Sequence, residues 1–362
     1  MNLEALAAEA VRLHHAGRHR QAAELYHRIL QTRPDHPGAL NGLGMIAFQA
    51  GRHDAAVALL ERVVATAGEH AGYLMNLGAV HDAAGHAEAA ADCYARAIGA
   101  APTYPDPYYN LGALHLRRGE ADRAVAIFDR CMAVIGREFH ALAYKAHALR
   151  DAGRDEAAAA LLDYERLVRL HPFTAPRGYP DLDAFNAALA EHVRRHPSLR
   201  ADVLSTVNGS HTGELLRPPQ GPMAALTPII GEAVAAYRAA LPDDAAHPMV
   251  RWAPRRWKLT GWGVVMRDGG HERSHIHPNG WLSGVLYVAL PEAVTRGDDH
   301  AGWLRFGEPT PELGARSPPL LRDYCPGYGR IVLFPSYFYH GTVPFQSEQP
   351  RICISFDVEP DD

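Results

Sequence analysis

Three histidines and one arginine in the C-terminal third of the chain have a spacing that could bind a metal ion. His275 and His277 are one residue apart, His340 follows 63 residues later, and Arg351 comes eleven residues after that. Neutral imidazole is a common metal ligand, and residues i and i+2 of a β-strand point to the same side. His275 and His277 could therefore bind one ion together, with His340 as a third ligand from another strand. The planar guanidinium of Arg351 suits a carboxylate, so the spacing predicts a metal site with an anchor for an acidic molecule.

The three histidines differ in one position from the usual site of non-haem iron oxygenases. That site combines two histidines and one carboxylate and leaves three coordination positions for cosubstrate and oxygen. His277 stands where Asp or Glu would be expected. Three neutral ligands would leave Fe(II) with its full double positive charge, and a dianionic chelator would then give a neutral complex. We therefore expect His277 to bind the metal directly, with a role beside the ligands or toward the substrate as the alternative.

Short β-strands are expected to position these residues. From about residue 250 the sequence alternates with period two and is rich in β-formers, with Gly and Pro at the turns. The predicted strands are 255–267, 271–278, 282–290, 302–308, 329–335, 340–345 and 351–358. Amphipathic helices are predicted over 182–196 and 223–241, a polar loop over 208–222, and a Gly- and Pro-rich insertion at the mouth of the site over 295–326. Many short strands indicate a barrel or sandwich, here with helices on one face.

Residues from about 178 to 358 resemble the Fe(II)/2-oxoglutarate-dependent oxygenases, in particular a bacterial HxHP-type branch that often carries tetratricopeptide repeats. The resemblance rests on HIHPNGWLSGVLYVALP, GWLRFGEP, LFPSYFYHGTVPF and RICISFDV. It implies a double-stranded β-helix (jelly-roll), with Fe(II) and 2-oxoglutarate as cofactors and molecular oxygen as a reactant. The implied reaction converts 2-oxoglutarate to succinate and CO₂ and hydroxylates a C–H bond of a substrate.

The resemblance also implies roles for individual residues. His275 and His340 carry over as iron ligands, and Arg351 carries over as the anchor for the far carboxylate of 2-oxoglutarate. His277 occupies the position of the acidic ligand, so we expect it to be the third. Additional hydroxyl donors to the cosubstrate are expected from Ser283, Tyr287 and Ser355.

The first half of the chain has a period of 34 residues. Glycine recurs at Gly17, Gly51, Gly85, Gly119 and Gly153. An alanine follows each glycine by five residues and a large apolar residue follows by nine, and Leu-Gly pairs recur between the glycines. This pattern resembles the tetratricopeptide repeat, which has two helices in each 34-residue unit. We expect about five repeats over 1–170, a Pro-rich linker over 171–181, and the oxygenase-like domain over 182–362.

A repeat array of this kind has a concave groove that commonly binds a peptide or another protein. We expect the array to recruit a protein or peptide, either as substrate or as partner. The alternative is a structural role, in which the array supports the second domain or mediates self-association into a homo-oligomer.

The composition excludes several classes of function. The net charge of −5 does not indicate a nucleic-acid-binding surface. Four cysteines without a CxxC pair argue against a disulfide scaffold and indicate a reducing cytoplasm. The first residues lack the apolar core of a signal peptide, and no apolar run approaches the roughly 20 residues that span a bilayer. We expect a cytoplasmic protein that binds neither nucleic acid nor membrane.

Two other interpretations compete with the oxygenase. Residues 271–275 match the HExxH motif of zinc proteases, but that motif needs a helix and here lies between Gly269-Gly270 and Pro278. The other is a scaffold protein whose β-domain has no turnover or holds a cupin-like three-histidine metal site. Other carboxylates that could be ligands have less suitable spacing; these are Asp268, Glu272 and Asp357.

Overall fold

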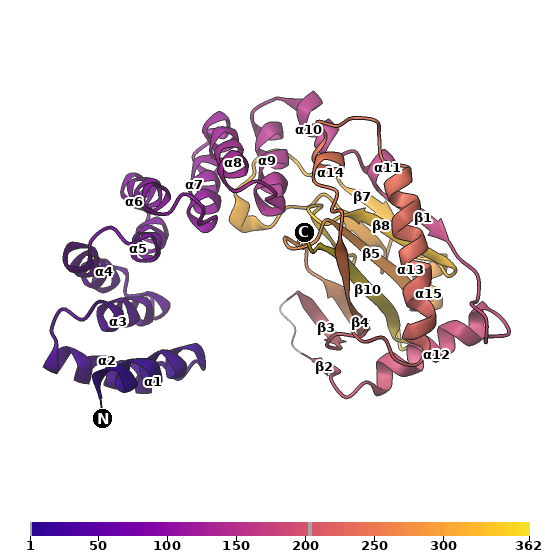
Figure 1. The fold of residues 1–362 in the computed structure, drawn as a ribbon, viewed down its shortest axis with the longest axis horizontal. Coiled ribbons are helices and arrows are strands. Elements are labelled where there is room, and N and C mark those ends of the chain that lie inside the picture. The colour runs from indigo at the N-terminus through magenta and orange to yellow at the C-terminus, as the bar shows by residue number, and fades with distance from the viewer. Residues whose placement is uncertain (1, 202–204, 298) are drawn as a thin grey trace. The chain divides into compact units, whose positions relative to one another are not determined.

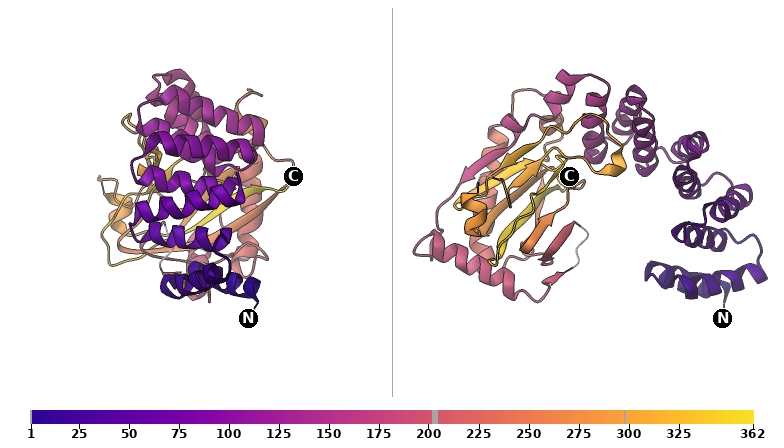
Figure 2. Two further views of the ribbon diagram at one scale, coloured as in Figure 1. Left: turned by 90° about the vertical axis from the view of Figure 1, so that its left-hand side faces the viewer. Right: turned by 180° about the vertical axis from the view of Figure 1, so that it is seen from behind.

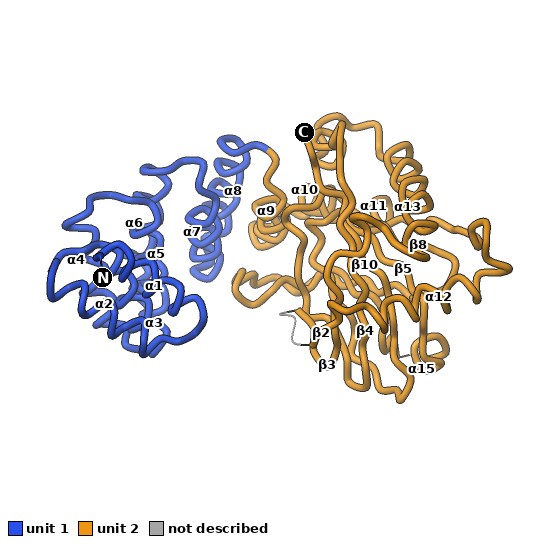
Figure 3. The backbone as a smooth tube through the Cα atoms, turned by 60° about the horizontal axis from the view of Figure 1, so that its bottom comes forward, with its two compact units in different colours: residues 1–136 blue, residues 137–362 orange. Residues whose placement is uncertain are grey.

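The computed structural model describes residues 2–201, 205–297 and 299–362. The chain divides into two units, one ending at Gly136 and the other beginning at Arg137 (Figure 3). No helix among the described residues is long and apolar enough to cross a membrane.

The first unit consists of helices that stack as successive antiparallel pairs (Figures 1 and 2). They are α1 Leu3–His15, α2 His19–Thr32, α3 Pro37–Gln49, α4 His53–Ala67, α5 Ala71–Ala83, α6 Ala87–Ala100, α7 Asp106–Arg117 and α8 Ala121–Ile135. The glycines of the 34-residue period lie between the two helices of a pair, with positive φ of 70° to 81° that glycine adopts without strain. The Leu-Gly pairs allow close packing, because a β-carbon on Gly112 would lie 2.2 Å from the ring of Phe128.

The second unit contains the fifth repeat and an antiparallel β-domain. Its helices are α9 Phe139–Asp151, α10 Asp155–Leu161, α11 Tyr164–Leu167, α12 Leu182–Arg195, α13 Pro222–Ala239, α14 Pro248–Arg251 and α15 Glu292–Arg296. Its strands are β1 Arg169–Pro172, β2 Arg200–Ala201, β3 Thr206–His211, β4 Trp257–Glu272, β5 Leu282–Ala289, β6 Leu304–Phe306, β7 Arg322–Tyr324, β8 Arg330–Pro335, β9 His340–Thr342 and β10 Arg351–Pro360.

The strands form two antiparallel sheets. The larger has the order β1-β8-β5-β10-β4-β3-β2 and the smaller has the order β7-β6-β9. Helices α12 and α13 pack on the larger sheet, where Val193 of α12 lies so close to Gly263 that a β-carbon there would be 2.5 Å away. The prediction of a helical repeat region followed by an antiparallel β-domain with flanking helices is confirmed.

The fifth repeat packs on the β-domain. The ring of His147 in α9 contacts Tyr339 edge-on with centroids 5.4 Å apart, and Tyr337 donates a 2.6 Å hydrogen bond to the Leu161 carbonyl. The division between the compact units therefore falls at Gly136, whereas the repeat period runs on beyond Gly153.

Several predicted segments differ in the structure. The polar stretch after residue 208 is not all loop, because β3 includes residues up to His211 and pairs with β4. Part of the predicted linker is strand β1, which pairs with β8. No separate strand covers 271–278, since β4 runs on to Glu272 and the chain then becomes irregular. The predicted insertion over 295–326, of which residue 298 lies outside the described part, contains β6, the short 3₁₀ helix η1 Pro311–Leu313 and β7.

Candidate metal centre

Backbone hydrogen bonds fix the three histidines relative to one another. His275 follows β4, His277 precedes β5, and His340 begins β9. The amide of His275 donates to the His340 carbonyl and the amide of His340 donates back, each over 3.0 Å. The amide of His277 donates to the Ser336 carbonyl over 2.9 Å. The irregular segment after β4 is therefore attached at two points to the region around β9.

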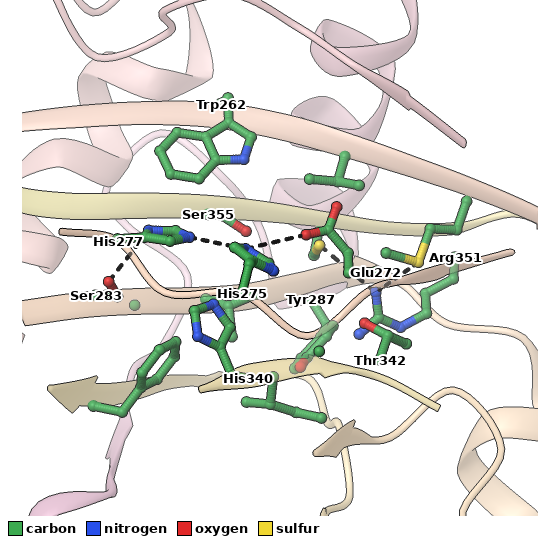
Figure 4. Close-up of a pocket in the computed structure, with 18 residues that line it drawn as sticks. Trp262, Glu272, His275, His277, Ser283, Tyr287, His340, Thr342, Arg351 and Ser355 are labelled. Atoms are coloured by element: carbon green, nitrogen blue, oxygen red, sulfur yellow. Dashed lines mark hydrogen bonds and ion pairs between the residues drawn. The ribbon is translucent and has the colours of Figure 1, made fainter. Parts of the chain in front are cut away.

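The three imidazole rings converge on one point (Figure 4). One ligand atom from each of His275, His277 and His340 lies within 4.8 Å of the other two. The Nε2 atoms of His275 and His277 are 3.0 Å apart. Two nitrogens bound at right angles to one ion by bonds of about 2.1 Å would be about 3.0 Å apart, so the spacing fits a divalent metal.

The second nitrogen of each ring is occupied by an acceptor. His275 Nδ1 lies 2.8 Å from the Arg273 carbonyl, His340 Nδ1 lies 2.9 Å from the Phe338 carbonyl, and His277 Nδ1 lies 2.7 Å from Asp357 Oδ1. Carbonyl and carboxylate oxygens accept, so each Nδ1–H donates, and in the neutral rings each Nε2 presents a lone pair to the common point. Lone pairs facing each other repel unless a cation lies between them. This arrangement is typical of metal-binding histidines, whose other nitrogen donates to a fixed acceptor.

The electrostatics of the rings suit metal binding. Burial and the neighbouring imidazoles lower the pKa of His275, and they lower the pKa of His340 well below its ordinary value. Burial also opposes a charge on His277, but the carboxylate of Asp357 outweighs it and raises the pKa of His277. Asp357 accepts a further hydrogen bond of 2.6 Å from Ser283, so the acceptor of His277 is itself held in place.

All the residues that the sequence singled out line one cavity between the two sheets. They are His275, His277, Ser283, Tyr287, His340, Arg351 and Ser355. Figure 4 shows the histidines toward one end and Arg351 toward the other. The hydroxyl of Ser283 is bonded to Asp357 and to Ser336, so it supports the histidines more directly than it offers a donor to the cavity. Ser355 lies on the cavity wall from β10.

Arg351 and Tyr287 have polar groups without full partners. Arg351 is only 2% exposed; its Nε donates to the Gly302 carbonyl over 3.1 Å, and its guanidinium lies 4.8 Å from the centre of the Tyr287 ring. No described carboxylate forms an ion pair with Arg351, and the buried Tyr287 hydroxyl has no hydrogen-bond partner in the described part of the chain. Burial raises the pKa of Tyr287 to about 12, so this hydroxyl remains a donor. A buried cation normally needs an anion nearby, and an acidic ligand in the cavity would supply it.

Glu272, which the sequence offered only as a metal ligand of less suitable spacing, also lines the cavity. It lies at the end of β4, where it accepts a 2.8 Å hydrogen bond from His211 and another from Thr206. Burial alone would raise its pKa, but the hydrogen bond from His211 and the imidazole of His275 lower the pKa of Glu272 to about 2. Because residues 271 and 272 belong to a strand, the HExxH helix of a zinc protease is absent here. No sequence signal could identify Thr206 and His211, since both were expected at or near a polar loop.

Family comparisons assign both parts of the chain. Residues 260–357, which include the three histidines and Arg351, match the family described as "Putative 2OG-Fe(II) oxygenase". Tetratricopeptide repeat families match residues 13–76 and, in two overlapping stretches, residues 50–105 and 75–131. The chain therefore carries tetratricopeptide repeats followed by a domain of this oxygenase family, as its sequence predicted. Comparison with curated proteins finds no match.

Solved structures with similarity to the chain include tetratricopeptide repeat proteins. The MamA protein is 22% identical, with a TM-score of 0.40 over 44% of this chain and 88% of that chain. YrrB, described as having an unusual peptide-binding site, is 17% identical, with a TM-score of 0.38 over 44% of this chain and 81% of its own. A thermophilic repeat protein of Thermus thermophilus, TTC0263, is 22% identical, with a TM-score of 0.36 over 45% of this chain and 89% of its own. At these scores the similarity carries no inference about function.

Proposed function

We propose that this protein is an Fe(II)- and 2-oxoglutarate-dependent dioxygenase, by class a hydroxylase, whose repeats recruit a protein or peptide as substrate or partner. The observation that carries the proposal is the pairing, in one cavity, of three converging Nε2 atoms with a buried arginine that lacks a carboxylate. A ligand with a chelating keto acid at one end and a carboxylate at the other would satisfy both ends. Matches to an oxygenase family and to tetratricopeptide repeats support the proposal.

The side chains of the site would have separate roles in binding iron or 2-oxoglutarate. His275, His277 and His340 would hold the iron, with Asp357 fixing the ring of His277. Arg351 would bind the distal carboxylate, and the Tyr287 hydroxyl would donate a hydrogen bond to the same ligand. Iron, when bound, would activate oxygen; oxidation of 2-oxoglutarate to succinate and CO₂ would supply two of the four electrons that oxygen takes up, and the C–H bond of the substrate would supply the other two.

An outer cleft offers a route for the substrate to the metal centre. Residues 308–312 and 341–344 line this cleft, and it shares Glu272, His275 and Thr342 with the inner cavity. A substrate in the outer cleft would therefore reach the position between the histidines.

The proposed cytoplasmic location would keep iron reduced. Among the described residues no disulfide joins the four cysteines.

The second candidate function is a binding protein with a cupin-like three-histidine metal site. The presence of His277 in place of a carboxylate favours it, because three neutral ligands are also compatible with a metal that does not turn over 2-oxoglutarate.

An anaerobic Fe(II) titration, with and without 2-oxoglutarate, tests the two candidates. We expect the weak visible charge-transfer band of the chelate only when both are present. In Arg351→Met the band should disappear while metal binding remains, because the substitution removes the anchor and leaves the histidines intact. Arg305→Met is the matched control, since Arg305 is already paired with Asp323 through hydrogen bonds of 2.7 and 2.8 Å.

The other outcomes contradict the proposal in different ways. Metal binding without the band would favour the cupin-like site, and no metal binding would favour the scaffold. A band that persists in Arg351→Met would mean that 2-oxoglutarate is anchored elsewhere.

A further inference from the structure

Glu272 lies where the inner cavity meets the outer cleft. It lines both, and it is the acidic side chain among the described residues that line the inner cavity. Its side chain is 14% exposed. On the strand ladder it stands directly opposite Thr206 of β3. A carboxylate at this point faces the proposed metal from the side on which a substrate would approach.

A β-bulge positions the two residues that hold Glu272. Thr206 and His211 are five residues apart, so a regular strand would place them on opposite faces. The register of β3 shifts between Val207 and Gly209, and the intervening Asn208 has a positive φ of 50°. Asn208 of β3 and residues 267–270 of β4 are unpaired at this point, and beyond this irregularity both Thr206 and His211 reach the same carboxylate. Each donates to Oε1 of Glu272 over 2.8 Å, and the two side chains also contact each other.

The other carboxylate oxygen of Glu272 faces the metal centre. Oε2 lies 3.5 Å from Nε2 of His275. Because Nδ1 of His275 donates to the Arg273 carbonyl, Nε2 presents a lone pair to this oxygen. Two electron-rich atoms facing each other require a positive charge nearby. Glu272 is not in the group whose ligand atoms all lie within 4.8 Å of one another, so it is placed beside the ligands and not among them.

We propose that Glu272 is the counter-charge of the metal centre, an outer-sphere carboxylate positioned by Thr206 and His211. This inference rests on the proposed metal site. It answers the charge question raised by His277, because the negative charge missing from the ligand set stands beside it. Asp357 lies behind His277, where its carboxylate is occupied by the ring N–H and by Ser283.

A counter-charge has opposite effects on the two ligands of the site. The negative charge of Glu272 attracts a divalent metal ion and repels the dianion 2-oxoglutarate. Its removal should therefore weaken metal binding and strengthen 2-oxoglutarate binding to the metal-loaded protein. A general loss of structure would weaken both, so the opposite signs separate this role from a merely structural one.

The test compares Glu272→Gln with the wild-type full-length protein under anaerobic conditions. Dissociation constants are measured first for Co(II) or Fe(II) alone, then for 2-oxoglutarate at saturating metal. We expect metal affinity to fall by about 10- to 100-fold, the range typical of outer-shell partners, and 2-oxoglutarate affinity to rise. Glu272→Asp keeps the charge and should recover most of the metal affinity. The exposed Glu348→Gln makes the same charge change on the surface and should alter neither constant.

Each remaining outcome overturns a defined part of the inference. If Glu272→Gln leaves both constants unchanged, or weakens both, Glu272 is not the counter-charge. If Glu272→Asp is as defective as Glu272→Gln, the carboxylate acts through exact placement and not through charge. If the wild-type protein binds no metal, the proposed function fails first and this inference fails with it.

Discussion

At the scale of single residues, folding has removed Arg351 and Tyr287 from water without giving them full partners. The guanidinium donates to one backbone carbonyl and to the weak sulfur acceptors of Met266 and Cys353, and it lies over the Tyr287 ring, whose hydroxyl has no partner in the described residues. A buried polar group left unsatisfied costs about 1–3 kcal/mol. The polar end of the cavity therefore favours ligand binding at the expense of the ligand-free fold.

Tyr287→Phe should therefore affect the stability of the ligand-free protein and its affinity for 2-oxoglutarate differently. Because no hydrogen bond is lost, the free energy of unfolding without ligands should stay the same or rise by up to about 1 kcal/mol. The affinity of the metal-loaded protein for 2-oxoglutarate should fall about 5- to 10-fold, since a net hydrogen bond contributes about 1 kcal/mol. Urea unfolding and 2-oxoglutarate titration measure the two effects.

Tyr324→Phe is the matched control for this prediction. The Tyr324 hydroxyl donates over 3.0 Å to the Tyr164 carbonyl, so its removal should lower stability by about 1 kcal/mol and leave 2-oxoglutarate affinity unchanged. Clear destabilisation of the ligand-free protein by Tyr287→Phe would show that the Tyr287 hydroxyl has a partner, such as an ordered water.

The sequence could predict residues whose chemistry is visible in spacing, but not those that depend on register. His275, His277, His340 and Arg351 were predicted together, and the structure brings them to one cavity. The histidines converge even though the predicted strand through 271–278 is irregular, because backbone bonds to residues 336 and 340 fix the segment. The spacing of Asp357 makes it a less suitable metal ligand, and in the structure its carboxylate instead accepts a hydrogen bond from Nδ1 of His277. The approach of Thr206 and His211 to Glu272 depends on a bulge that the local sequence pattern does not predict.

At the scale of elements, helix α9 holds the loop that borders the outer cleft. Asp151 ends this helix, and its carboxylate accepts hydrogen bonds of 2.8 and 2.7 Å from the amides of Arg316 and Ser317. Arg150 donates over 2.6 Å to the Pro318 carbonyl. These residues continue from the cleft-lining segment 308–312, so a helix of the repeat series fixes a wall of the proposed substrate entrance.

Asp151→Ala should loosen this loop without disturbing the metal centre. Two backbone amides lose a charged acceptor, and a loss of about 1.4 kcal/mol in local stability would accelerate their hydrogen exchange about tenfold. We expect faster exchange at residues 316 and 317 and unchanged affinities for metal and 2-oxoglutarate. Asp155→Ala, an exposed residue at the start of α10, is the control. Equal exchange in both variants would show that the loop is held by other contacts.

At the scale of the whole molecule, the repeat period and the compact units mark different boundaries. A period is a local property, so the sequence could show that repeats continue past Gly153. It could not show what the fifth repeat packs on. Helix α9 has buried residues around most of its circumference, from Phe139 to Leu149. A helix that is buried on most sides needs partners on more than one face, and contacts with residues such as Trp252 and Tyr339 supply them.

Two truncations should therefore behave differently. A chain of residues 137–362 keeps the whole second unit, and it should unfold cooperatively and bind metal within about twofold of the full-length protein. A chain of residues 171–362, cut at the predicted linker, loses α9 to α11 and half of β1. It uncovers Phe338, whose ring packs on Tyr164 with centroids 4.9 Å apart, and leaves the Tyr337 hydroxyl without the Leu161 carbonyl. Because the turn carrying these residues leads directly into His340, we expect the shorter chain to lose both cooperative unfolding and metal binding. Urea unfolding and Co(II) titration of the two chains measure this difference. If the shorter chain binds metal like the longer one, the fifth repeat belongs functionally to the array, and the domain boundary lies near residue 170.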